Sequence, residues 1–186
     1  MLESLQALDR TVFLALNGMH TPYWDSFMYI FTSKLVWIPL YVSILYVLYK
    51  NMNIRMVIFT TLMFALLIAL ADQTCSSILR PIFERPRPSR DPAIADIVHI
   101  VNGKRGGKFG FPSFALACFM MLLFKNRALT TFFMLWAIVT CYTRIYVGVH
   151  YPGDLLFGTL VGFAAGAVTY GIYRFCLRID GIANGV

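Results

Sequence analysis

The sequence predicts an all-α membrane protein, a polytopic bundle of about five transmembrane helices preceded by an N-terminal helix in the membrane interface. Hydrophobic residues make up 59% of the 186 residues and charged residues only 13%, and the mean hydropathy is +0.68. Apolar runs recur that approach the roughly 20 residues needed to cross a bilayer core. These values exclude a water-soluble monomer, and we treat residues 1–186 as one membrane-embedded domain.

The N-terminal segment, residues 1–24, lacks the basic leader and the small-residue cleavage site of a signal peptide. Val12, Phe13 and Leu16 can share one face of a short amphipathic helix. We therefore expect this segment to lie in the interface rather than to cross the membrane.

Five apolar segments follow, and each is close to spanning length if tilt and burial are allowed. Lys34 interrupts the first, so that helix is either tilted or interfacial in its first half. Asp72, near the end of the second, is expected to pair with a cation at the outer rim rather than to act in catalysis. The predicted spans are approximately Phe27–Tyr49, Met56–Leu79, Gly110–Phe124, Leu129–Tyr142 and Leu155–Phe175; along the last, Gly158, Gly162 and Gly166 form a strip for close helix packing.

The basic residues predict the orientation. The net charge is +7, and the short connectors at residues 50–55 and 125–127 are both basic, which assigns their side to the cytoplasm. The long loop of residues 80–110 and the turn at residues 143–154 then face outward. We expect an integral protein of a bacterial inner membrane with an extracytoplasmic site, with lipid and not nucleic acid as its partner. The oligomeric state is left open.

Three outward-facing segments carry candidate chemistry. The first contains Arg80, Arg85 and Arg87 among prolines, and arginine offers a planar fork of donors that matches phosphate oxygens. A solvated loop that meets anionic head groups is the alternative. The second, Gly-Phe-Pro-Ser ending at Ser113, begins a helix whose free N–H groups suit a phosphate, although Pro-Ser is also an ordinary helix start.

The third segment holds His150 and Asp154, four residues apart across a helix start, so that the carboxylate can lie beneath the imidazole. Such an imidazole can act as a base or nucleophile, or the pair can be an interfacial hydrogen bond. Arg144, close by in sequence, favours the first interpretation. Because all three segments emerge on one face, a phosphate is predicted to contact five side chains together: Arg80, Arg87, Ser113, Arg144 and His150.

These residues resemble the three motifs of the type 2 phosphatidic acid phosphatase superfamily, membrane lipid phosphatases related to vanadium haloperoxidases. The first motif, Lys, six residues, Arg-Pro, is matched with Arg in place of Lys by Arg80 and Arg87-Pro88. The third, Ser-Arg, five residues, His, three residues, Asp, is matched with Thr in place of Ser by Thr143, Arg144, His150 and Asp154.

The middle motif departs from the family. It reads Pro-Ser-Gly-His or Pro-Ser-Ser-His there, but here Ala115 stands where the histidine is expected. In the family this histidine is the general acid, and a shift of one residue would put Phe114 there with the same chemical consequence. His99 is a poor substitute in the long loop. The chain is either an inactivated form of an active enzyme or a natural member that has lost or rerouted acid catalysis.

The resemblance implies a metal-independent, cofactor-free phosphatase. His150 would form a phosphohistidine, Asp154 would fix its tautomer, and the arginines with Ser113 would hold the phosphoryl oxygens. The implied substrate is a membrane lipid phosphate, such as undecaprenyl diphosphate, phosphatidylglycerol phosphate, phosphatidic acid or a lipid A phosphate. A catalytically silent lipid-phosphate binder is the alternative, and Ala115→His is expected to raise phosphate release if the acid assignment is right.

Overall fold

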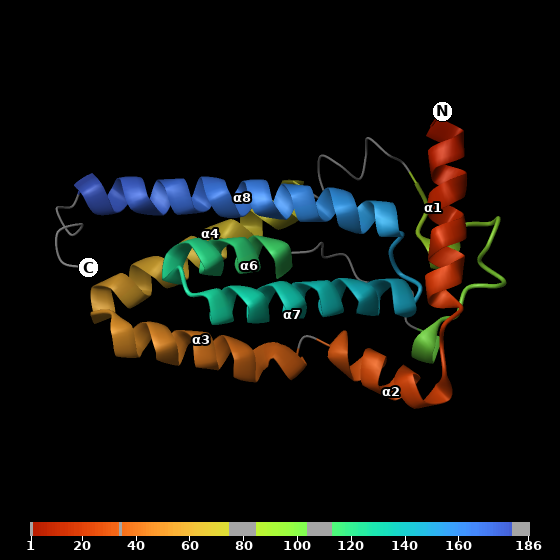
Figure 1. Ribbon diagram of the computed structural model, residues 1–186, viewed down its shortest axis with the longest axis horizontal. Coiled ribbons are helices and arrows are strands. Elements are labelled where there is room, and N and C mark those ends of the chain that lie inside the picture. The colour runs from red at the N-terminus through yellow and green to blue at the C-terminus, as the bar shows by residue number, and fades with distance from the viewer. Residues whose placement is uncertain (1, 34, 75–84, 104–112, 180–186) are drawn as a thin grey trace.

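The computed structural model describes residues 2–33, 35–74, 85–103 and 113–179, and these contain helices and no strand. The apolar segments fold into a bundle of elongated helices, which confirms the predicted fold class (Figure 1). In chain order the elements are α1 (Leu2–Asn17), α2 (Pro22–Phe31), η1 (Leu35–Trp37), α3 (Ile38–Asn51), α4 (Ile54–Gln73), η3 (Pro88–Arg90), η4 (Val101–Gly103), α6 (Ser113–Phe124), α7 (Arg127–Tyr146) and α8 (Pro152–Ile179).

Helix α6 is the centre of the bundle, because it packs against α4, α7 and α8. Residues 114–120 are all buried, as expected for a helix that is apolar all round. A Cβ on Gly166 of α8 would lie 2.8 Å from the Cβ of Cys118, and one on Gly162 would lie 3.0 Å from the backbone nitrogen of Ala115. The two glycines therefore let α8 approach α6 closely, as the glycine strip predicted.

The number of spanning helices differs from the five expected. Within the described ranges, α4, α7 and α8 are long and apolar enough to cross a membrane. The segments Pro22–Phe31 and Leu35–Asn51 together pass the same test but are bent by 67° relative to each other, so they form at most one broken span. Lys34, expected to interrupt this span, lies outside the described residues. Helix α6 has only 12 residues, about 18 Å of helix, which is well short of a hydrocarbon core of about 30 Å.

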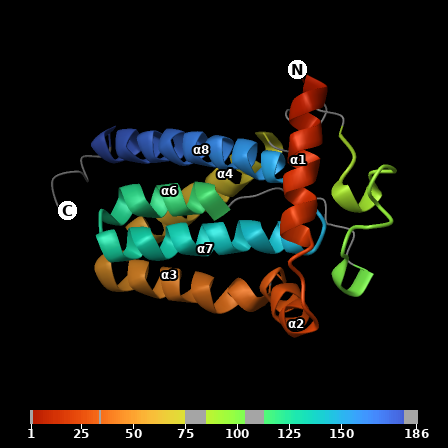
Figure 2. The same ribbon diagram turned by 45° about the vertical axis from the view of Figure 1, so that its right-hand side comes forward.

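Helix α1 lies across the ends of α7 and α8 rather than alongside them (Figures 1 and 2). Its exposed stripe is apolar, with Leu5, Leu8 and Val12 exposed by 58%, 61% and 40%. Such a stripe on a helix that crosses the bundle end is compatible with the interfacial position expected for residues 1–24, which stays a prediction.

The face that α1 presents to the protein is not the predicted one. Val12 is exposed, whereas Phe13 and Asn17 are fully or almost fully buried, and Asp9 and Arg10 also turn inward. The expected grouping of Val12 with Phe13 was wrong because the charged residues find partners in the protein and so rotate the helix. The inward face therefore combines the apolar ring of Phe13 with the polar side chains of Asp9, Arg10 and Asn17.

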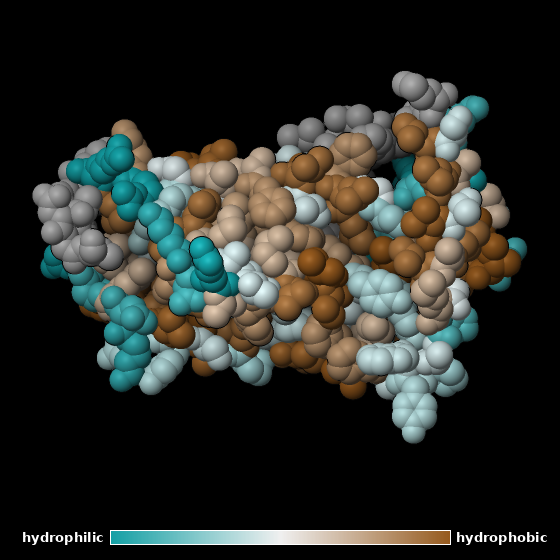
Figure 3. Space-filling model, in the orientation of Figure 1, coloured by the Kyte–Doolittle hydropathy of each residue, from teal (hydrophilic) through white to brown (hydrophobic). Residues whose placement is uncertain are grey.

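The two ends of the bundle differ in what they carry. The α3–α4 and α6–α7 connections and the last turns of α8 lie at one end, and α1, α2 and the α7–α8 turn lie at the other (Figure 1). Hydrophilic side chains gather at the first of these ends, and apolar ones cover the middle of the face drawn (Figure 3). The two basic connectors thus share one end, and the candidate site occupies the opposite one.

Candidate active site

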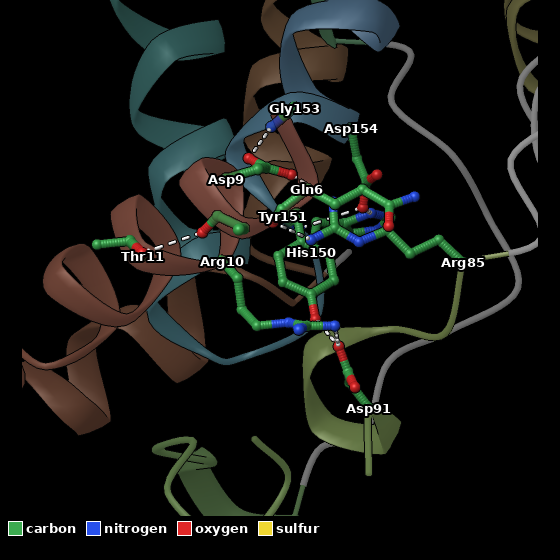
Figure 4. Close-up of polar contacts among 11 residues, drawn as sticks. Gln6, Asp9, Arg10, Thr11, Arg85, Asp91, His150, Tyr151, Gly153 and Asp154 are labelled. Atoms are coloured by element: carbon green, nitrogen blue, oxygen red, sulfur yellow. Dashed lines mark hydrogen bonds and ion pairs between the residues drawn. The ribbon is translucent and has the colours of Figure 1, made fainter. Parts of the chain in front are cut away.

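The start of α8 brings His150 and Asp154 together. Pro152 is the first residue of the helix, where a missing N–H costs nothing and the fixed φ suits the helix. Two residues later, the Asp154 carboxylate accepts a hydrogen bond of 3.1 Å from the N–H of Tyr151, just before the helix. This cap leaves Asp154 Oδ2 3.6 Å from His150 Nδ1 (Figure 4). That distance is an electrostatic pairing, longer than a hydrogen bond.

The environment keeps the His150 imidazole neutral. Burial lowers the pKa of His150 below its ordinary value, and the nearby charges of Arg87 and Arg144 lower it further, although Asp154 opposes them. A neutral imidazole has a free nitrogen lone pair at neutral pH, as a nucleophile requires. Arg144 also adjoins this turn through its backbone, since its carbonyl accepts a hydrogen bond of 3.0 Å from the N–H of Val149.

Arg87 and Arg144 lie in two different segments. Arg144 lies in the last turn of α7, and Arg87 directly precedes η3. The loop with Arg87 is fixed to the α7–α8 turn by a hydrogen bond of 3.2 Å from the N–H of Ser89 to the carbonyl of Gly148. Gly148 has φ 74° and a Cβ there would lie 2.9 Å from the His99 carbonyl oxygen, so glycine is required. The structure thus gathers His150, Asp154, Arg87 and Arg144 at one end of the bundle.

The remaining predicted site residues are Arg80, Ser113 and Ala115. Arg80 lies outside the described residues, and Ser113 is described only as the first residue of α6. Ala115 is fully buried, and its backbone packs at Gly162. Gly162 follows Asp154 by eight residues, which is about 12 Å along the helix. The structure does not bring Ala115 to the His150–Asp154 pair.

His99 is held by other groups. Its Nε2 lies 2.9 Å from Asp25 Oδ1, and its ring stacks on that of His20 with centroids 3.7 Å apart. Tyr146 donates a hydrogen bond of 2.8 Å to the same carboxylate oxygen. His20 and His99 are the only histidines besides His150 in the chain, and both belong to this cluster. No group of three His, Cys, Asp or Glu side chains in the described ranges could hold a metal ion.

Sequence reasoning missed a network around Tyr151. Its hydroxyl donates a hydrogen bond of 2.6 Å to Asp91 Oδ2, which also accepts one of 2.9 Å from Arg10. Burial raises the pKa of Tyr151 to about 12, and Asp91 raises it as well. Burial would also raise the pKa of Asp91, but the hydrogen bonds from Tyr151, the N–H of Ala93 and Arg10 outweigh it, so this pKa is lowered. Asp91 is therefore ionised and Tyr151 neutral at neutral pH.

The network continues over the aromatic ring of Tyr151. The Arg85 guanidinium lies 3.4 Å from the centroid of the Tyr151 ring and forms an ion pair with Asp9 (Figure 4). The ring of Phe13 packs edge-on against Tyr151. The signal that could have found this network is the charge of Asp9 and Arg10 opposite the apolar stripe of α1.

The family of the chain follows from its similarity to known proteins. The profile of the PAP2 superfamily matches residues 59–178. The chain belongs to the PAP2 superfamily. It is 48% identical over 177 residues to the lipid A 4'-phosphatase of Bacteroides thetaiotaomicron, covering 91% of this chain and 79% of that protein. It is 34% identical over 182 residues to the lipid A 4'-phosphatase of Porphyromonas gingivalis, covering 94% and 76%.

Two solved structures share the fold. Aquifex aeolicus LpxE superposes with a TM-score of 0.59 at 23% identity, over 87% of this chain and 93% of that one. A PAP2 type phosphatidylglycerolphosphate phosphatase from Bacillus subtilis superposes with a TM-score of 0.62 at 21% identity, over 92% and 87%. The chain is thus an integral membrane protein of a family of lipid phosphatases, and the predicted family and fold class are confirmed.

Proposed function

We propose that this protein is a lipid phosphate phosphatase that works through a phosphohistidine at His150. The observation that carries the proposal is the pairing of the His150 imidazole with the Asp154 carboxylate, in a turn that is hydrogen-bonded to the backbone of Arg144 and to the loop that follows Arg87. Phosphoryl transfer needs an in-line nucleophile and positive charge around the equatorial oxygens. The four side chains supply both.

In the first step Nε2 of His150 attacks phosphorus as the bond to the leaving oxygen breaks, and the leaving oxygen takes a proton from water. Asp154, on the Nδ1 side, holds the tautomer and stabilises the charge that develops on the ring. Arg87 and Arg144 bind the phosphoryl oxygens, with Arg80 and Ser113 proposed beside them as the family motif implies. Water then attacks the phosphohistidine and releases inorganic phosphate. Arginines carry the charge in this scheme, so no metal or cofactor takes part.

The proposed substrate is the 4'-phosphate of a lipid A type glycolipid in the outer leaflet of the inner membrane. The two lipid A 4'-phosphatases, at 48% and 34% identity over most of the chain, support this choice. The apolar stripe of α1 supports a site at the membrane interface. The basic connectors at the opposite end of the bundle support an extracytoplasmic position.

A second candidate function is a catalytically silent lipid-phosphate binder. The absence of a histidine from the middle motif favours it, because the side chain of Ala115 cannot donate a proton and is buried against α8. Loss of a positioned general acid typically removes roughly a hundred- to ten-thousandfold in rate. His150 paired with Asp154 favours the enzyme, because a binder needs no oriented nucleophile.

The deciding experiment incubates purified protein with lipid A bisphosphate in mixed vesicles, with His150→Ala as the control. The enzyme predicts loss of the 4'-phosphate by mass spectrometry and an acid-labile phosphate on His150 in a rapid quench. Loss of the other phosphate alone would reject the proposed substrate. Binding of the lipid with neither release nor labelling would reject the enzyme in favour of the binder.

A further inference from the structure

Helix α1 lies outside residues 59–178, the part of the chain that the PAP2 profile matches. Its inward face nevertheless contacts the segments with the site residues. Asp9 is the central contact, since its carboxylate meets two of these segments at once. One oxygen, Oδ1, accepts a hydrogen bond of 2.8 Å from the N–H of Gly153, and the other forms an ion pair with Arg85 (Figure 4).

Each of these partners adjoins a site residue. Gly153 directly precedes Asp154 in the first turn of α8, so the bond to its N–H acts on the helix end that orients His150. A Cβ on Gly153 would lie 2.9 Å from Asp9 Oδ2, which means that glycine is what lets the carboxylate approach.

Arg85 is joined to Arg87 through Pro86, and Arg87 is followed by Pro88. Proline fixes its own φ and restricts the residue before it, so a fixed Arg85 also limits where Arg87 can stand. The Arg85 side chain is held between Asp9 and the Tyr151 ring, with only 14% of it exposed.

A parallel link runs one residue further along α1. Arg10 donates to Asp91, which also accepts from the Tyr151 hydroxyl. The ion pairs and hydrogen bonds of Asp9 and Arg10 reach across 76 to 144 residues of sequence. The loop with Arg87 and the turn with His150 are thus joined to each other through one helix.

We propose that Asp9 is a positioning residue of the phosphatase site, whose carboxylate sets the loop of Arg87 against the α8 start that holds His150 and Asp154. The inference rests on the proposed function for its kinetic readout. Asp9 itself stands behind the site and touches no reacting atom.

The test compares four variants in vesicles of lipid A bisphosphate. Asp9→Ala removes both contacts, and Asp9→Asn keeps an oxygen for the Gly153 N–H but loses the charge that pairs with Arg85. Arg85→Gln and the double variant with Asp9→Ala complete a mutant cycle. The matched control is Glu3→Gln, which removes the same charge from an exposed position on the same helix.

Asp9→Ala is expected to lower kcat about a hundredfold with a smaller change in KM, because small misplacements of reacting groups are costly. Asp9→Asn is expected to lower it about tenfold, and Glu3→Gln to leave it unchanged. In the double variant the losses are expected to be less than multiplicative. A wild-type kcat for Asp9→Ala, or a lower melting temperature alone, would overturn the proposal, as would fully multiplicative losses in the cycle.

Titration with orthophosphate separates this inference from the proposed function. If the wild-type protein releases no phosphate from any lipid, the phosphatase assignment fails, but the positioning role still predicts at least tenfold weaker orthophosphate binding in Asp9→Ala. If orthophosphate binds both proteins equally, Asp9 does not position the site.

Discussion

Replacing Ala115 with histidine tests whether the general acid of a PAP2 site can stand at this position. Ala115 is fully buried, and its backbone nitrogen lies 3.0 Å from the place of a Cβ on Gly162. Overpacking such an interface costs typically about 1–3 kcal/mol, and a buried imidazole nitrogen left without a partner adds about 1–3 kcal/mol. Near Gly162 the new ring would also stand about 12 Å along α8 from Asp154. We therefore expect Ala115→His to melt about 5–20 °C lower, with no gain in rate.

The assay is phosphate release in vesicles, combined with thermal unfolding of the purified protein. Ala128→His serves as the control, because Ala128 is exposed at the start of α7, and it is expected to leave both quantities unchanged. A gain of about a hundredfold or more in Ala115→His, the range that a positioned general acid supplies, would refute this reasoning. It would mean that the α6 start reaches the phosphate.

Three further predictions follow from the site and the helix packing. Because burial lowers the pKa of His150, the acid limb of the pH profile of kcat/KM should lie below pH 6.5. The Asp154→Asn variant lacks a group that raises this pKa, so its acid limb should lie lower still, and its kcat should fall by about a hundredfold or more. Gly166→Ala should lower the free energy of unfolding by about 1–2 kcal/mol, because its Cβ would lie 2.8 Å from that of Cys118. Gly171→Ala should raise it by up to about 1 kcal/mol, because nothing lies within 4 Å of its Cβ. Equal stabilities of the two variants in thermal unfolding would contradict this. Treatment with EDTA should leave phosphate release unchanged, and reactivation by an added divalent cation would reveal a metal step.

The sequence sufficed for the features that depend on local pattern. Helices α4, α7 and α8 follow from long apolar runs, because a bilayer demands length and apolarity together. The pairing of His150 with Asp154 follows from a spacing of four residues across a helix start. Both depend on residues that are close in the chain, so no tertiary information was needed to predict them.

The remaining features depend on how helices stack. The burial of Ala115 is fixed by the axial offset between α6 and α8, which the glycines of α8 set and which a motif pattern cannot encode. The rotation of α1 is likewise set by the partners of Asp9 and Arg10, which are distant in sequence. An amphipathic pattern gives the apolar face of a helix, but it does not tell whether the polar face meets water or another part of the protein.

The position of α1 also affects where the boundaries of a shortened form of the protein should lie. A fragment trimmed to residues 59–178 would retain Arg87, Arg144, His150 and Asp154 and the whole region that matches the PAP2 profile. It would lack the helix that closes the bundle end. Arg85 would then lose its ion pair with Asp9, and Asp91 would lose its ion pair with Arg10. Expression boundaries for this enzyme are therefore better drawn from the contacts of its first 17 residues than from the limits of its family match.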